Sequence, residues 1–95
     1  MPSDWPPKLR QIIESTEFSR SRDALGIEPR LMDDALEAWT WLLARMPEWG
    51  HQVGETPVHT LTFEIPEDGI EVTVFYTFNE KAVTLEDVMV SHPGE

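Results

Sequence analysis

The sequence predicts an α+β fold in which two helices pack on one face of a small, mostly antiparallel sheet that ends in a three-stranded meander. Two observations predict this class. Apolar side chains recur at i, i+3, i+4 and i+7 between residues 29 and 46, which is the period of a helix. Between residues 58 and 90, three runs alternate apolar and polar side chains with a period of two, which is typical of strands. Residues 1–95 suffice for a single domain with one core.

The start of the chain predicts a lead-in and then a short element of undecided type. Residues 1–8 contain three prolines, which indicates an irregular lead-in. Residues 8–14 (KLRQIIE) fit two structures equally well. Leu9, Ile12 and Ile13 suit one face of a short helix, and the isoleucine pair also suits a short buried strand. Periodicity over seven residues leaves strand and helix open.

A first helix is expected directly afterwards. Ser15 or Thr16 is a residue type that caps a helix N-terminus, and the helix would run through Ala24. Gly26 then lies where a helix commonly ends in a left-handed residue.

The clearest element is the second helix. Pro29 suits its first turn, and Pro47 stops it, because proline inside a helix lacks the backbone donor and clashes with the preceding turn. Trp39 lies on the apolar face, whereas Trp41 points nearly opposite at about 100° per residue. Trp41 and Trp49 are therefore expected either to bind a partner or to be covered by another element.

The C-terminal half of the chain predicts the sheet. Strands and the turns between them are expected at Val58–Ile65, 66–69, Ile70–Phe78, 79–81 and Ala82–Val90. This spacing indicates an antiparallel meander with one face in the core and the other in water. The apolar phase of the last strand changes near Glu86 and Asp87, which predicts a β-bulge. Residues 91–95 are expected to be a tail.

The composition excludes several classes of function. The chain carries 18 acidic and 7 basic residues, and its formal charge of −11 disfavours direct binding of free nucleic acid or of an anionic membrane surface. It has no cysteine, so disulfides, thiolate metal sites and cysteine nucleophiles are excluded. No secretory signal and no apolar run of membrane-spanning length are visible. We therefore expect a soluble, cytoplasmic protein.

The acidic residues indicate one surface of the sheet. Residues 46–95 contain ten acidic side chains and a single basic one, Lys81. Several of these carboxylates alternate with threonines on the face that points away from the core. We therefore predict a binding surface for a protein or peptide of basic character. The candidate binding residues are Thr60, Thr62, Glu64, Glu71, Thr73, Phe75 and, on the second helix, Trp41.

Phe75 is an aromatic residue on this otherwise polar face. It would stack on a ligand or anchor a partner peptide if it were exposed. The alternative is that the N-terminal segment covers it.

No cofactor and no metal site are predicted. His51, His59 and His92 are scattered along the chain, and no histidine or carboxylate lies near them at metal-ligand spacing. The adjacent acidic pairs of the chain indicate solvated charge, because neighbouring residues in a helix or strand point in different directions.

Four stretches of the chain carry a resemblance to a known family. They are residues 12–18 (IIESTEF), 35–47 (ALEAWTWLLARMP), 48–54 (EWGHQVG) and 74–83 (VFYTFNEKAV). In this order they resemble the opening strand and capped helix, the second helix, the glycine-bearing link and the aromatic-rich hairpin of the RelE/ParE superfamily of bacterial toxins. The resemblance covers roughly residues 9–92. It implies a RelE/ParE-like fold and an origin in a toxin–antitoxin module.

The resemblance also implies where a catalytic site would lie. The mRNA-cutting members use a positively charged site on the open face of the sheet. The strand positions that hold lysines in those nucleases fall here on Thr60 and Thr62, and an arginine position falls on Glu71. The basic residue at the end of the last strand falls near His92 and Pro93. The nuclease site is not recognisable, because a lone imidazole supplies little stabilisation to the charge that develops at phosphorus.

Three functions follow as hypotheses. In the first, the chain is a toxin-fold protein that binds a basic, antitoxin-like protein or peptide and is not an enzyme. In the second, it is a ribosome-dependent mRNA endoribonuclease with an atypical site, in which the ribosome supplies affinity and His92 with Tyr76 supplies the chemistry. In the third, it is an acidic mimic that inhibits a nucleic-acid-binding protein. The sequence does not decide whether the chain forms a homodimer.

Overall fold

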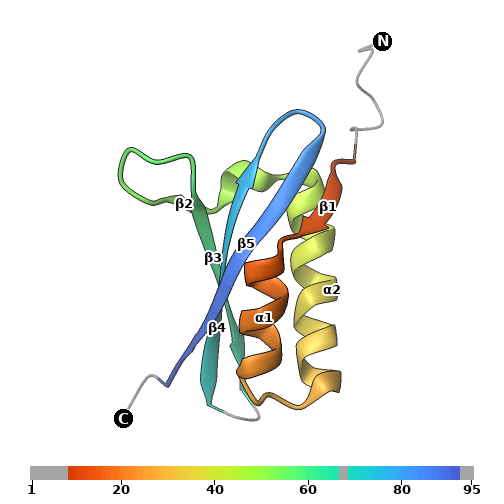
Figure 1. Ribbon diagram of the computed structural model, residues 1–95, viewed down its shortest axis with the longest axis vertical. Coiled ribbons are helices and arrows are strands. Elements are labelled where there is room, and N and C mark those ends of the chain that lie inside the picture. The colour runs from red at the N-terminus through yellow and green to blue at the C-terminus, as the bar shows by residue number, and fades with distance from the viewer. Residues whose placement is uncertain (1–8, 67–68, 93–95) are drawn as a thin grey trace.

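The computed structural model describes residues 9–66 and 69–92 as a sheet with two helices on one of its faces (Figure 1). The elements are β1 (Gln11–Glu14), α1 (Thr16–Ala24), α2 (Pro29–Arg45), the 3-10 helix η1 (Pro47–Trp49), β2 (His51–Gln52), β3 (His59–Ile65), β4 (Ile70–Phe78) and β5 (Ala82–Ser91). The strands form one sheet in the order β1-β5-β4-β3-β2. The sheet is mixed, because β1 runs parallel to β5 while the other pairs are antiparallel. The predicted α+β class and the meander of β3, β4 and β5 are confirmed.

The segment whose structure the sequence left open forms a strand, β1. Gln11–Glu14 pair in parallel with residues 82–85 of β5. Ile12 packs against the buried core from this position. A parallel neighbour comes from a distant part of the chain, so the periodicity of the segment itself could not identify it.

Ser15 links the start of α1 to β5. Its hydroxyl accepts a hydrogen bond from the backbone N–H of Phe18 at 3.0 Å, which caps α1 as predicted. The same hydroxyl donates to the carbonyl oxygen of Glu86 at 3.1 Å. At the other end of this helix, Gly26 adopts a φ of 72°, which confirms the left-handed residue expected there.

The predicted bulge in β5 is confirmed at Glu86. Two consecutive residues of β4 pair with Leu85 and Asp87, so Glu86 between them has no partner residue in β4. The extra residue restores the phase of the strand, because Leu85 before it and Val88 after it are both buried. The bulge also presents the Glu86 carbonyl to α1.

The core lies between the two helices and the inner face of the sheet. Its largest fully buried side chains are Trp39, Tyr76, Phe18, Leu43, Leu85, Val72, Val74 and Val83. Trp39 packs edge-on against Phe63, with ring centroids 5.3 Å apart. The predicted apolar face of α2 is therefore confirmed as the face that covers the sheet.

The link between α2 and β3 contains two short elements that the sequence did not predict, η1 and β2. Tyr76 positions both, because its hydroxyl donates to the carbonyl oxygen of Pro47 and accepts from the backbone N–H of Gly50 at 3.0 Å. A Cβ atom at Gly50 would overlap that hydroxyl, so this close approach requires glycine. The contact holds the chain toward the core just before β2, and β2 pairs with only two residues of β3.

The ends of the chain need one correction. Ser91, which the sequence assigned to the tail, is the last residue of β5 and pairs with Glu71 of β4. The lead-in 1–8, residues 67–68 of the expected turn and residues 93–95 of the tail, including Pro93, lie outside the described residues. Within residues 9–66 and 69–92, no helix has the length and apolar character needed to cross a membrane.

Candidate binding surface

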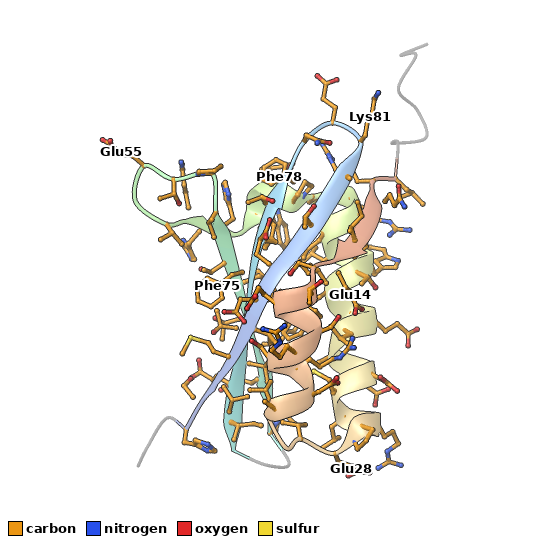
Figure 2. The ribbon with its side chains drawn as sticks, in the orientation of Figure 1. Glu14, Glu28, Glu55, Phe75, Phe78 and Lys81 are labelled. Atoms are coloured by element: carbon orange, nitrogen blue, oxygen red, sulfur yellow. The ribbon has the colours of Figure 1, made fainter. Side chains whose placement is uncertain are left out.

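The face of the sheet opposite the helices carries six of the seven predicted binding residues, and we call it the open face. Figure 2 labels Phe75 on this face. Strand pairing arranges its side chains in three rows across β3, β4 and β5. The rows are Thr60, Phe75 and Asp87; Thr62, Thr73 and Met89; and Glu64, Glu71 and Ser91. The alternation of the strands therefore gathers residues that lie up to 31 positions apart onto one surface.

The open face combines carboxylates with hydroxyl groups. Glu64 lies directly opposite Glu71, and like charges at such positions destabilise a sheet by a few tenths of a kcal/mol, roughly. The hydroxyls of Thr62 and Thr73 form a cross-strand hydrogen bond of 2.8 Å in the neighbouring row. Strands β3, β4 and β5 contain no lysine or arginine that would neutralise these carboxylates. The carboxylates of the open face are therefore not paired with a basic side chain from these three strands.

Two apolar side chains lie among these polar groups. Phe75 is half-buried and Met89 is 47% exposed. Figure 2 shows Phe75 pointing away from both helices. Residues 1–8, which the alternative placed over Phe75, lie outside the described residues. The described part of the N-terminal segment, β1, pairs at the edge of the sheet beyond β5. Phe75 and Met89 provide an apolar contact area at the centre of an acidic surface.

Sequence reasoning missed the contribution of β5 to the open face. Glu86 accepts a hydrogen bond from the Thr77 hydroxyl at 2.8 Å, and Asp87 and Met89 lie in the rows of Phe75 and Thr73. The bulge decides which side chains of β5 point outward, so the pairing register was needed to place them. The phase change near Glu86 was the available signal.

Trp41 belongs to a different surface. It lies on the outer side of α2 and is 58% exposed, so another described element does not cover it. The guanidinium of Arg45 stacks on its ring, with Cζ 4.1 Å from the ring centroid, and also donates to the Trp41 carbonyl at 2.8 Å. Trp49 is likewise exposed, at 63%.

The structure does not bring together the pair proposed for nuclease chemistry. Tyr76 is fully buried on the inner face, and its hydroxyl already makes the two hydrogen bonds to Pro47 and Gly50. His92 is exposed just beyond the end of β5. Its neighbour Ser91 pairs with Glu71, which lies five residues before Tyr76 in β4. That offset corresponds to about 17 Å along the strand.

Burial also makes Tyr76 a poor proton donor or acceptor. It raises the pKa of the Tyr76 hydroxyl above its ordinary value of 10.0, although the hydrogen bond from Gly50 acts in the opposite direction. In the structure, Tyr76 and His92 therefore lie too far apart to act together as the endoribonuclease hypothesis requires.

The three histidines lie apart from one another. His51 is exposed in β2, and His92 follows β5. His59 lies on the inner side of β3, where its ring packs against Phe78 at 5.1 Å and Tyr76 at 5.8 Å between centroids. In the part of the chain that the structure describes, no group of three or more histidine, aspartate or glutamate side chains is placed to hold a metal ion.

No protein-family model matches the chain, and no curated protein matches it.

Proposed function

We propose that this chain is a RelE/ParE-like toxin-fold protein, related to toxin–antitoxin modules, that acts by binding a basic polypeptide on the open face and has no nuclease activity. The observation that carries the proposal is the charge of that face. Glu64, Glu71, Glu86 and Asp87 contribute carboxylates to it, and β3, β4 and β5 contain no lysine or arginine.

The order of elements supports the family part of the proposal. The stretch that resembles the opening of these toxins forms a strand, a serine cap and a helix with Phe18 in its first turns. The stretches that resemble the second helix and the hairpin form α2 and the β4–β5 pair. Such agreement concerns the frame of the molecule, and function still depends on the site.

Electrostatics argue against RNA cleavage on the open face. Cleavage needs positive groups where negative charge develops on the phosphate, and the open face offers carboxylates instead. A phosphate backbone that approached Glu64 and Glu71 would also meet repulsion rather than counterion release. A basic polypeptide gains from the same arrangement, because its lysines and arginines pair with these carboxylates.

The neutral side chains of the open face suit a polypeptide partner as well. Threonine hydroxyls such as those of Thr62 and Thr73 both donate and accept hydrogen bonds. Phe75 and Met89 offer apolar area of the kind that anchors an interface. The net charge of −11 would speed the encounter with a basic partner at low salt.

The test compares the tagged full chain with two variants. Glu71→Lys combined with Phe75→Thr changes the open face, and Asp33→Lys places a matched charge change on an exposed position of α2. Proteins captured by the parent and by Asp33→Lys but lost with the double variant are identified, purified and titrated by calorimetry. We expect a basic partner whose affinity falls at least tenfold with the double variant and falls steeply with salt.

Two outcomes would contradict the proposal. One is a partner that binds the double variant as tightly as the parent. The other is cleavage of mRNA by the purified chain on translating ribosomes, since the open face would then perform the chemistry that its charge opposes.

A further inference from the structure

The outer edge of β3 is open over most of its length. β2 pairs with β3 only at His59 and Thr60, and among the described residues no other strand lies beside Leu61–Ile65. An open edge presents backbone N–H and C=O groups to which another extended segment can pair. Immediately before β2, the hydrogen bonds of the Tyr76 hydroxyl hold the chain at Pro47 and Gly50 toward the core, and these residues do not pair with β3.

The pairing pattern identifies which backbone groups point outward. In an antiparallel ladder, hydrogen-bonded pairs alternate with non-hydrogen-bonded pairs. The N–H of Val53 donates to the carbonyl of Val58 at 2.8 Å, so the alternation directs the backbone groups of Thr60 toward β2. The backbone groups of Thr62 and Glu64 point to the same side, where no described strand lies.

A groove between α2 and β3 runs beside this open edge. It is a hollow of ≈ 260 Å³ whose lining includes Asp34 and Ala38 of α2. Its remaining lining residues are Leu31, Ala35, Phe63, Glu64, Ile65 and Pro66. The groove is therefore apolar along its floor and acidic at its rim, and no lysine or arginine lines it.

We propose that an extended segment of a basic polypeptide adds to the sheet as a new strand along β3. Its backbone pairs with the outward groups of Thr62 and Glu64. Alternate side chains then point to opposite faces of the sheet. One set enters the groove against Phe63 and Ala38, and the other set lies beside the carboxylates of the open face.

This geometry specifies the chemistry of the segment. Side chains in the groove are apolar, and those on the open face are lysine or arginine. The segment thus alternates the two types with a period of two. The basic character of the partner rests on the proposed function, whereas its extended form rests on the β3 edge and the groove alone.

A second copy of this chain is a poorer occupant of the edge. Two copies would each bring a charge of −11, and pairing along β3 would place acidic residues such as Glu64 near those of the other copy. In such a dimer the added strand would be the β3 of the second copy, which contains no lysine or arginine to pair with the carboxylates of the open face.

The probe for this inference is an acetylated, amidated octapeptide of alternating valine and lysine, titrated into the ¹⁵N-labelled full chain. We expect saturable shifts at the amides of Thr62, Glu64 and Ala38, together with interstrand contacts between the peptide and β3. A valine–glutamate peptide should not bind. Ala38→Lys, which fills the groove from an exposed position on α2, should weaken binding at least tenfold, whereas the control Ala24→Lys on α1 should leave it within twofold.

Backbone methylation separates strand addition from simple charge attraction. Two further peptides carry N-methyl groups either on every lysine amide or on every valine amide. Only one of these sets pairs with β3, so one peptide should lose at least tenfold in affinity and the other should retain most of it. Equal affinities for the two peptides would overturn the inference.

The remaining outcomes distinguish this inference from the proposed function. Binding that survives Ala38→Lys but is lost in the open-face double variant would overturn strand addition while supporting the proposed function. Absence of peptide binding would overturn the inference, and the capture experiment would still judge the proposed function separately. A dimer in sedimentation that Ala38→Lys dissociates would overturn the inference in favour of a second copy.

Discussion

Tyr76→Phe is the sharpest test of how the link before β2 is held toward the core. The substitution keeps the buried ring and removes only the hydroxyl that joins β4 to the link before β2. That hydroxyl donates to the carbonyl of Pro47 and accepts from the N–H of Gly50, and Tyr76 is fully buried. The variant therefore leaves two backbone groups without their partner.

The expected loss follows from these two groups. A buried polar group without a partner costs about 1–3 kcal/mol. Pro47 is buried and Gly50 is half-buried, so water reaches only part of the second group. We expect a total loss of about 2–4 kcal/mol, against a stability of about 5–14 kcal/mol for a domain of this size. The variant should fold but unfold more easily.

Urea unfolding followed by circular dichroism measures this loss. At a slope of about 1.5 kcal/mol per molar urea, the midpoint should fall by roughly 1–3 M with the slope unchanged. Thr84→Val is the matched control, because it removes a strand hydroxyl on the opposite face of the sheet from Tyr76 and should change stability by less than about 0.5 kcal/mol. If Tyr76→Phe unfolds within about 0.5 kcal/mol of the parent, the hydroxyl does not hold the link and our account of the chain before β2 is wrong.

Two further predictions concern pH and the link between α1 and β5. Because burial raises the pKa of Tyr76 above 10.0, the unfolded chain loses this proton first, so stability should be fully present below pH 10.0 and fall as pH rises toward the folded pKa. Tyr76 is the only tyrosine, so near-ultraviolet tyrosinate absorbance should show a midpoint above 10.0, and a midpoint at or below it would contradict the burial. Ser15→Ala should cost about 1–2 kcal/mol in urea unfolding, because it removes the cap of α1 and the hydrogen bond to Glu86. Ser21→Ala within the same helix is the control, and an equal effect of both variants would refute the role of the cap.

Much of the frame could be predicted because local patterns specify it. The spacing of apolar residues predicted α2, the alternation predicted β3, β4 and β5, and the phase change near Glu86 predicted the bulge. Ser15 and Gly26 marked the two ends of α1. Each of these signals lies within a few residues of the feature that it predicts, which is why sequence reasoning reached it.

The candidate site could be predicted only in part. Alternation placed Thr62, Glu71 and Phe75 on one face, since side-chain direction in a strand follows from position alone. Nothing in the local pattern revealed the contact of the Tyr76 hydroxyl with Gly50, which lies 26 residues earlier.

By itself, the sequence determined that this is an α+β chain whose sheet presents an acidic, threonine-rich face without basic residues. Only the tertiary structure decided that residues 11–14 form a strand, because their partner is β5 at the far end of the chain. It also decided that β2 stops after two residues and leaves the edge of β3 open beside a groove lined by α2. These features depend on contacts between segments distant in sequence, and such contacts produce no periodic pattern of apolar residues within either segment.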